Sequence, residues 1–151
     1  MAKDPNEASG EYDSVDDNPL NQLMPKGPAK GYGGSKSFIA KLMECQQSLA
    51  VLHWKTTSYA EHKALGEAYE SLAGQIDGFV ESFIGIKGRE VLNGITSLSI
   101  MNDVKSVLMA VENVLRKDIP SAVGDKETSL LNLRDEMLDL VQHTRYLLTL
   151  S

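Results

Sequence analysis

The feature that most constrains this chain is the spacing of its apolar residues after Ser35. Phe38, Leu42, Cys45, Leu49 and Leu52 recur every three or four residues, which is the period of one face of an α-helix. This spacing predicts a first helix over about residues 36–56. No segment shows the strict alternation of a half-buried strand, so the sequence predicts an all-α fold.

Three more helices follow from the same kind of pattern. Ser58 and Glu61 fit a capping box, so a second helix is expected from Tyr59 to about Ile84. A third apolar stripe predicts a helix that ends before Pro120, and a fourth stripe runs from Leu130 nearly to the end of the chain. The third stripe comprises Ile100, Val104, Val107, Leu108, Val111 and Leu115. Four amphipathic helices predict a four-helix bundle over residues 36–151.

The order of the helices in space is only partly readable. The first and second helices, and the third and fourth, are joined by short links, so each pair is expected to be antiparallel. Residues 86–99 link the second helix to the third and can span at most about 45 Å when extended. The second helix is about 40 Å long. The link could therefore run the length of the bundle, as in ferritin-like folds, or turn back as a long loop.

Residues 1–35 differ from the rest of the chain. They hold four of the five prolines and end in PKGPAKGYGGS. A segment that buries so little apolar surface cannot offset its ordering entropy, so we expect a flexible N-terminal tail. Its acids outnumber its lysines. The tail is either a disordered leader or a docking arm for a protein partner, with Leu20, Leu23 and Met24 as a small anchor.

Charge and composition exclude several classes of protein. The net charge of −6 argues against nucleic acid as a partner, because phosphate contacts need Lys and Arg. No stretch approaches the roughly 20 apolar residues of a membrane span, and the N-terminus has no apolar run of the kind that marks a signal peptide. The single cysteine, Cys45, rules out a disulfide within the chain. A cytoplasmic protein is expected, or a virion component if the chain is phage-encoded.

The second helix carries a set of polar residues on one face. At 100° per residue, Glu70, Asp77 and Glu81 lie together beside the apolar stripe. His62 lies at the border of that face, but about 22 Å from Asp77 along the helix axis. A metal site that uses both residues therefore needs two chains related by a two-fold axis.

These residues resemble the ferroxidase signature of the Dps-like miniferritins. That signature has a His-Trp pair on the first helix, matched by His53-Trp54, then a His matched by His62. Fifteen residues later it has D-x-x-x-E, matched by Asp77 and Glu81. The resemblance implies a ferritin-like bundle and a di-iron site at a dimer interface, with histidines from one chain and carboxylates from the other. The expected ligands are His53, His62, Asp77 and Glu81.

The chain departs from the signature at one ligand. The family has an Asp four residues after the second His, and this chain has Gly66 there. The adjacent Glu67 is rotated by about 100°, and Glu70 could replace the missing carboxylate only if the helix shifted. The extra small helix of the family is also missing from the short link at residues 86–99.

Two classes of function remain. Imidazole and carboxylate ligands suit Fe(II), and also Mn(II) or Zn(II). The first reading is therefore an iron-binding homo-oligomer, at least a dimer and at most a closed shell, that oxidises Fe(II) and stores it. The second is a non-enzymatic assembly or virion protein on a ferritin-like scaffold with a degenerate metal site. The LHWKT…YLLTL layout is also similar to that of small phage-encoded proteins, a resemblance that implies no particular chemistry.

Several conspicuous residues have ordinary structural readings. Trp54 and Tyr59 are expected to pack against the bundle, and His143 is expected to be structural. Cys45 lies on the apolar stripe of the first helix, which indicates an inert core thiol. The spacing of three methionines on the later helices indicates core filling; they are Met101, Met109 and Met137.

Overall fold

The computed structural model describes residues 37–151, so the prediction of a flexible tail over residues 1–35 lies outside the described residues. The described part is all-helical and contains no strand, which confirms the expected fold class. Its helices are α1 (Phe38–Lys55), α2 (Tyr59–Lys87), a 3₁₀ turn η2 (Arg89–Leu92), α3 (Val104–Asn113), a π-helical turn η3 (Val114–Asp118), α4 (Ile119–Val123) and α5 (Thr128–Leu148).

Polar side chains fix the starts of three helices. The hydroxyl of Ser37 accepts from the amide of Ile39 at α1, and the carboxylate of Asp103 accepts from the amide of Ser106 at α3. At α2, Ser58 accepts from the amide of Glu61, as the sequence predicted. The reciprocal half of the capping box is absent, because the Glu61 carboxylate instead accepts from the hydroxyl of Thr56 at 2.6 Å.

The second helix is longer than its sequence pattern predicted. It continues past Ile84 to Lys87 and ends where Gly88 adopts a φ of 90°. That left-handed conformation is readily available to glycine, so Gly88 rather than Gly85 marks the end of the helix.

The expectation that the third helix begins at Ile100 and stops before Pro120 was wrong at both ends. Ile100 precedes the helix and is 43% exposed. At the other end, helical backbone continues through η3 and α4 to Val123. The amide of Ile119 donates to the carbonyl of Val114, five residues back, and this wider π register admits the proline. Local pattern reasoning missed this because a π turn depends on its tertiary surroundings.

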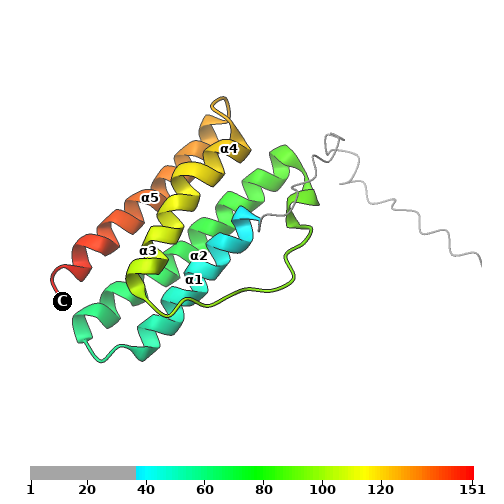
Figure 1. Ribbon diagram of the computed structural model, residues 1–151. Coiled ribbons are helices and arrows are strands. Elements are labelled where there is room, and N and C mark those ends of the chain that lie inside the picture. Colours follow the sequence, from blue (N-terminus) through cyan, green and yellow to red (C-terminus); the bar gives the residue numbers. More distant parts are fainter. Residues whose placement is uncertain (1–36) are drawn as a thin grey trace, which may run out of the picture.

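The four long helical segments form a bundle in which α1 lies against α2 and α3, and α5 lies against α2 and α3 (Figure 1). The link between α2 and α3 runs the length of the bundle along α1 (Figure 1). The amide of Ser99 donates to the carboxylate of Glu44, and the amide of Met101 donates to the hydroxyl of Ser48. The link is thus a crossover, and α2 and α3 point in the same direction.

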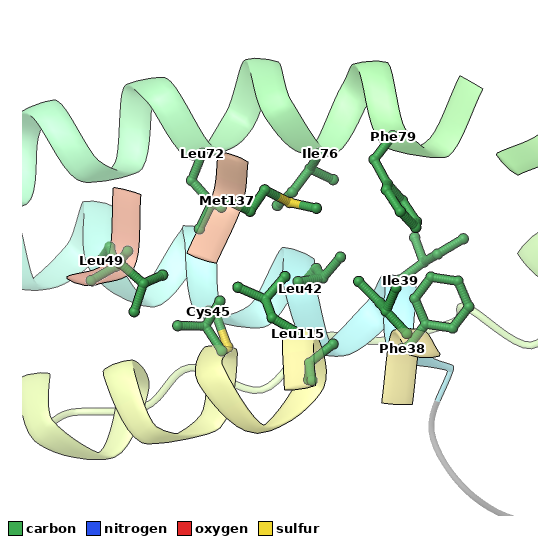
Figure 2. Packing of buried hydrophobic residues seen from close by; sticks show 14 of the residues in the cluster. Phe38, Ile39, Leu42, Cys45, Leu49, Leu72, Ile76, Phe79, Leu115 and Met137 are labelled. Atoms are coloured by element: carbon green, nitrogen blue, oxygen red, sulfur yellow. The ribbon is translucent and has the colours of Figure 1, made fainter. Parts of the chain in front are cut away.

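The core lies along the axis of the bundle and takes side chains from every long helix. Figure 2 shows Leu42 of α1 with Leu72 and Ile76 of α2 and Met137 of α5, while Cys45 of α1 and Leu115 of η3 lie on the side toward α3. At the α1 start, the ring of Phe38 packs edge-on against Phe79 and Phe83. Within residues 37–151, none of the helices combines the length and apolar character that a membrane span requires.

Candidate metal site

The two histidines of the predicted site come together where α1 ends and α2 begins. The short turn between the helices places the His53 and His62 rings in a stack, with centroids 3.8 Å apart and planes inclined by 21°. Each Nδ1 lies at hydrogen-bond distance from the backbone carbonyl of the other histidine, at 2.7 Å from His62 O and 3.0 Å from His53 O. We call this reciprocal arrangement the histidine clasp.

The clasp determines which ring nitrogen carries the proton. A carbonyl oxygen only accepts, so each Nδ1 must donate, and each neutral ring then keeps its lone pair on Nε2. Neither Nε2 has a hydrogen-bond partner among the described residues. This is the arrangement by which proteins orient metal-binding imidazoles, with one nitrogen held by a carbonyl and the other directed to the ion.

Gly66 lies one turn along α2 from His62, at a position where the structure leaves no room for a side chain. A Cβ atom at Gly66 would lie 2.9 Å from Cε1 of His53 and 3.1 Å from its Nδ1. The imidazole of His53 therefore occupies the space that a side chain at position 66 would need. The chain lacks a carboxylate there, and the histidine clasp fills the vacated volume.

The predicted carboxylates lie elsewhere on the molecule. Glu70, Asp77 and Glu81 are all exposed on the outer side of α2. Asp77 is about 22 Å from His62 along the helix, as the sequence implied. In the part of the chain that the structure describes, no group of three or more His, Cys, Asp or Glu side chains could hold a metal ion. One chain thus supplies separate halves of the predicted ligand set and never a complete one.

Tyr69 is a neighbour that sequence reasoning missed. Its ring centroid lies 5.3 Å from that of His53, and its hydroxyl donates to Glu70 at 3.3 Å. Burial and the adjacent Glu70 carboxylate raise the pKa of the Tyr69 hydroxyl. The signal was available, because Tyr69 follows His62 by two helical turns and so projects from nearly the same face.

Two aromatic residues beside the clasp do not pack as predicted. Trp54 is 68% exposed and Tyr59 is 78% exposed, so the expectation that they pack against the bundle was wrong. They flank the turn at the end of α1, where the bundle offers no layer to cover them. Met109 is also not core-filling, since it is 59% exposed, whereas Met137 is fully buried as predicted.

Comparison with known proteins places the chain in a family. It is 26% identical over 118 residues to an uncharacterized 14.6 kDa protein encoded in the mobD-ri intergenic region of Enterobacteria phage T4. That match covers 76% of this chain and 87% of the phage protein. No solved structure matches. A family model described as a family of unknown function, DUF5856, matches residues 53–148, from His53 in the clasp nearly to the end of α5. The chain belongs to this family.

Proposed function

We propose that this protein binds a divalent transition metal, Fe(II) in the first place, at sites shared between two copies of the chain, and oxidises it there. His53 and His62 of one copy supply imidazole nitrogens, and Asp77 and Glu81 of the other supply carboxylates. Glu70 extends the same acidic face. The minimum assembly is a dimer, and repetition of the contact can close a shell that stores the ferric product.

The observation that carries this proposal is the histidine clasp. Both Nδ1 atoms are held by carbonyls, and both Nε2 lone pairs are left for a ligand. The exposed carboxylates of Asp77 and Glu81 on α2 are oxygen ligands of the kind that Fe(II), Mn(II) and Zn(II) accept together with imidazole. The lengthwise crossover between α2 and α3 supports a ferritin-like arrangement of the bundle, since such folds have one long crossover.

The proposed reaction is the oxidation of two Fe(II) ions by dioxygen. Two Fe(II) ions each lose one electron, and dioxygen takes both electrons with two protons to give hydrogen peroxide. The imidazoles and carboxylates hold the ions and balance their charge, while the subunit interface keeps the site open to the oxidant. The iron is the substrate, so it enters as Fe(II) and leaves as a ferric product.

Fe(II) oxidation in air, with about two irons per chain as a two-metal site requires, tests the proposal. Glu81→Gln changes an exposed carboxylate without touching the core, so oxidation should fall to the buffer rate while the fold is kept. Glu67→Gln, an exposed carboxylate on the same helix, and His143→Ala, an exposed histidine on α5, are matched controls that should leave the rate unchanged.

Mixing two inactive variants tests whether the site is shared. His62→Ala and Asp77→Asn chains should each be inactive alone. After co-refolding in equal amounts, half of the dimers would be mixed, and each mixed dimer would hold one intact site. Activity should therefore return to about a quarter of the wild-type rate for a two-fold dimer. No recovery would contradict a site divided between chains.

A second candidate is a non-enzymatic assembly protein, and one observation favours it. The clasp is complete without metal, because each Nδ1 is satisfied by a carbonyl and the His53 ring closes against Gly66. The similarity to an uncharacterized protein of phage T4 supports only a phage-encoded origin for this candidate. Oxidation no faster than buffer, with an intact oligomer, would favour this candidate over the first.

A further inference from the structure

A groove opens between the start of α3 and the end of α5. Its apolar walls come from Val104, Leu108, Met109 and Leu148, and its volume is about 590 Å³. Met109 is 59% exposed within it, although methionine is a residue that usually fills cores. We call this hollow the α3–α5 groove.

The groove lies at the end of the bundle where exposed apolar side chains gather. The end of α1, which holds Trp54, the start of α2 at Tyr59 and the end of α5, which holds Tyr146 and is followed by Leu150, all lie there (Figure 1). The last two are 59% and 63% exposed. Exposed apolar side chains that gather at one end of a molecule are a feature of interaction sites.

The rim of the groove carries two acids, Glu61 and Asp103, and the base Lys105. Glu61 accepts from Thr56, and the Asp103 carboxylate accepts from the amide and hydroxyl of Ser106. Both acids are thus engaged within the fold. Lys105, on the same rim, makes no direct ion pair among the described residues, although, after the hydrogen bonds from Ser106, its charge helps to lower the pKa of the Asp103 carboxyl.

We propose that residues 16–24 of this chain, DDNPLNQLM, occupy the α3–α5 groove. Leu23 and Met24 follow Leu20 by three and four residues, which is the spacing of the apolar anchors in segments that dock into apolar grooves. Pro19 follows Asn18 in the order favoured at the first positions of a helix. The apolar face would contact Leu108, Met109 and Leu148, and Asp16 and Asp17 would lie toward Lys105.

The chain between this segment and the bundle is long enough. Residues 25–36 link Met24 to the N-cap Ser37, and twelve extended residues reach at most about 40 Å. The groove lies at the opposite end of the bundle from Ser37, and the 18 residues of α1 cover about 27 Å. The linker contains Pro25, Pro28 and several glycines.

Methionine methyl NMR of the full chain tests this proposal directly. The chain has six methionines, and they include Met24 in the segment, Met109 in the groove and Met43, which is exposed on α1. With ¹³C-labelled methyl groups, docking predicts a cross-relaxation peak between Met24 and Met109, and none between Met24 and Met43.

Two tail variants make the test independent of folding. Leu20→Ser with Leu23→Ser removes the anchor from a segment outside the bundle core, so the methyl peak should vanish and the Met109 resonance should shift. Tyr32→Ser, an apolar change in the linker, is the control and should alter neither signal. Met43 should not respond to any of these changes.

The possible results distinguish a docked segment from an undocked one. A Met24–Met109 peak that persists on dilution places the segment in its own chain's groove, and one lost on dilution places it in a neighbour's groove. Both support the proposal, since the occupant is the same. A Met24 resonance at the free-peptide position, with Met109 unmoved by the anchor variant, overturns it. The proposal is also overturned if a group other than the tail covers the Met109 side chain. Neither result depends on metal binding.

Discussion

Gly66 leaves a space on α2 that the imidazole of His53 fills. The clash distance of 2.9 Å for an added Cβ is shorter than real contacts allow, so one of the two groups would have to move. The ring is held by its bond to the His62 carbonyl and by stacking on the His62 ring. The absence of a side chain at position 66 and the histidine clasp are therefore parts of one local arrangement.

Gly66→Ala should lower the free energy of unfolding by about 1 kcal/mol, because overpacking costs about 1–3 kcal/mol and the better helix propensity of Ala returns only part of it. Urea unfolding measures the change. The matched control is Gly74→Ala on the same helix, where an added Cβ meets nothing within 4 Å. That control should gain about 0.5–1 kcal/mol.

The cause of the Gly66→Ala loss can be isolated with a double-mutant cycle. In a His53→Ala background the obstacle is gone, so Gly66→Ala should become neutral or stabilising like the Gly74 control. If the same loss persisted without the His53 ring, the imidazole would not be the group that requires glycine.

Cys45 is a second residue whose burial has a measurable consequence. Burial, and then the neighbouring Glu44, raise the pKa of its thiol to about 12, from 9.0. In the unfolded chain the thiol ionises near pH 9, whereas in the folded chain it keeps its proton. The free energy of unfolding therefore falls as pH rises from about 9 toward 12, by up to about 1.4 kcal/mol per pH unit from this group.

Cys45→Ala removes this contribution, so its stability should depend less steeply on pH above 9 than that of the wild type. Urea unfolding at pH 8, 9.5 and 10.5 measures the difference between the two slopes. Below pH 9 the two slopes should coincide. Parallel curves throughout would mean that the folded thiol ionises as freely as the unfolded one.

At the scale of a single element, the π turn η3 shows how a helix passes through a proline. In the α or π register, the amides that could reach the carbonyl of Leu115 belong to Ile119 and Pro120. Ile119 donates to Val114 instead, and Pro120 has no N–H. Arg134 of α5 replaces the missing donor, with Nη1 at 3.1 Å from the Leu115 oxygen.

Arg134→Met should therefore lower the free energy of unfolding by about 1–3 kcal/mol, the cost of leaving a buried acceptor unsatisfied. Pro120→Ala restores a backbone N–H, so in that background the same change should cost less. Arg116→Met is the control, since this exposed arginine takes part in a surface ion pair worth about 0.5 kcal/mol or less. If Arg134→Met lowered the free energy of unfolding equally in both backgrounds, Arg134 would not be compensating for the N–H that Pro120 lacks.

At the scale of the whole molecule, the crossover between α2 and α3 decides how the helices are connected. Its course depends on two polar residues of α1 that are buried among apolar ones. Ser48 is fully buried and accepts from the amide of Met101, while Glu44 is 9% exposed and accepts from the amide of Ser99. These side chains satisfy backbone donors in residues 95–103 of the crossover, which have no secondary structure of their own.

Ser48→Ala should speed amide hydrogen exchange at Met101 about tenfold or more, because a backbone donor loses its partner at a cost of about 1–3 kcal/mol. Thr144→Ala is the matched control. Its buried hydroxyl bonds only to Leu140 of its own helix, so the crossover should not respond. Glu44→Gln keeps an accepting oxygen and should retain protection at Ser99, whereas Glu44→Leu should not.

The sequence by itself determined the helices and most of the core. Leu42, Leu72 and Met137 were readable as interior residues because the 3.6-residue period relates each side chain to neighbours only a turn away. The same reasoning showed that His62 and Asp77, fifteen residues apart on one helix, could not share a site within one chain. These conclusions rest on local geometry, which any helix imposes.

Tertiary structure decided the rest, for a single physical reason: the deciding contacts join residues far apart in sequence. The crossover follows α1 because Glu44 and Ser48 meet amides more than fifty residues later. The third helix passes Pro120 because Arg134 on another helix supplies a donor. Gly66 reads as a missing ligand in the sequence, and only the packing of α1 on α2 shows that the His53 ring takes its space.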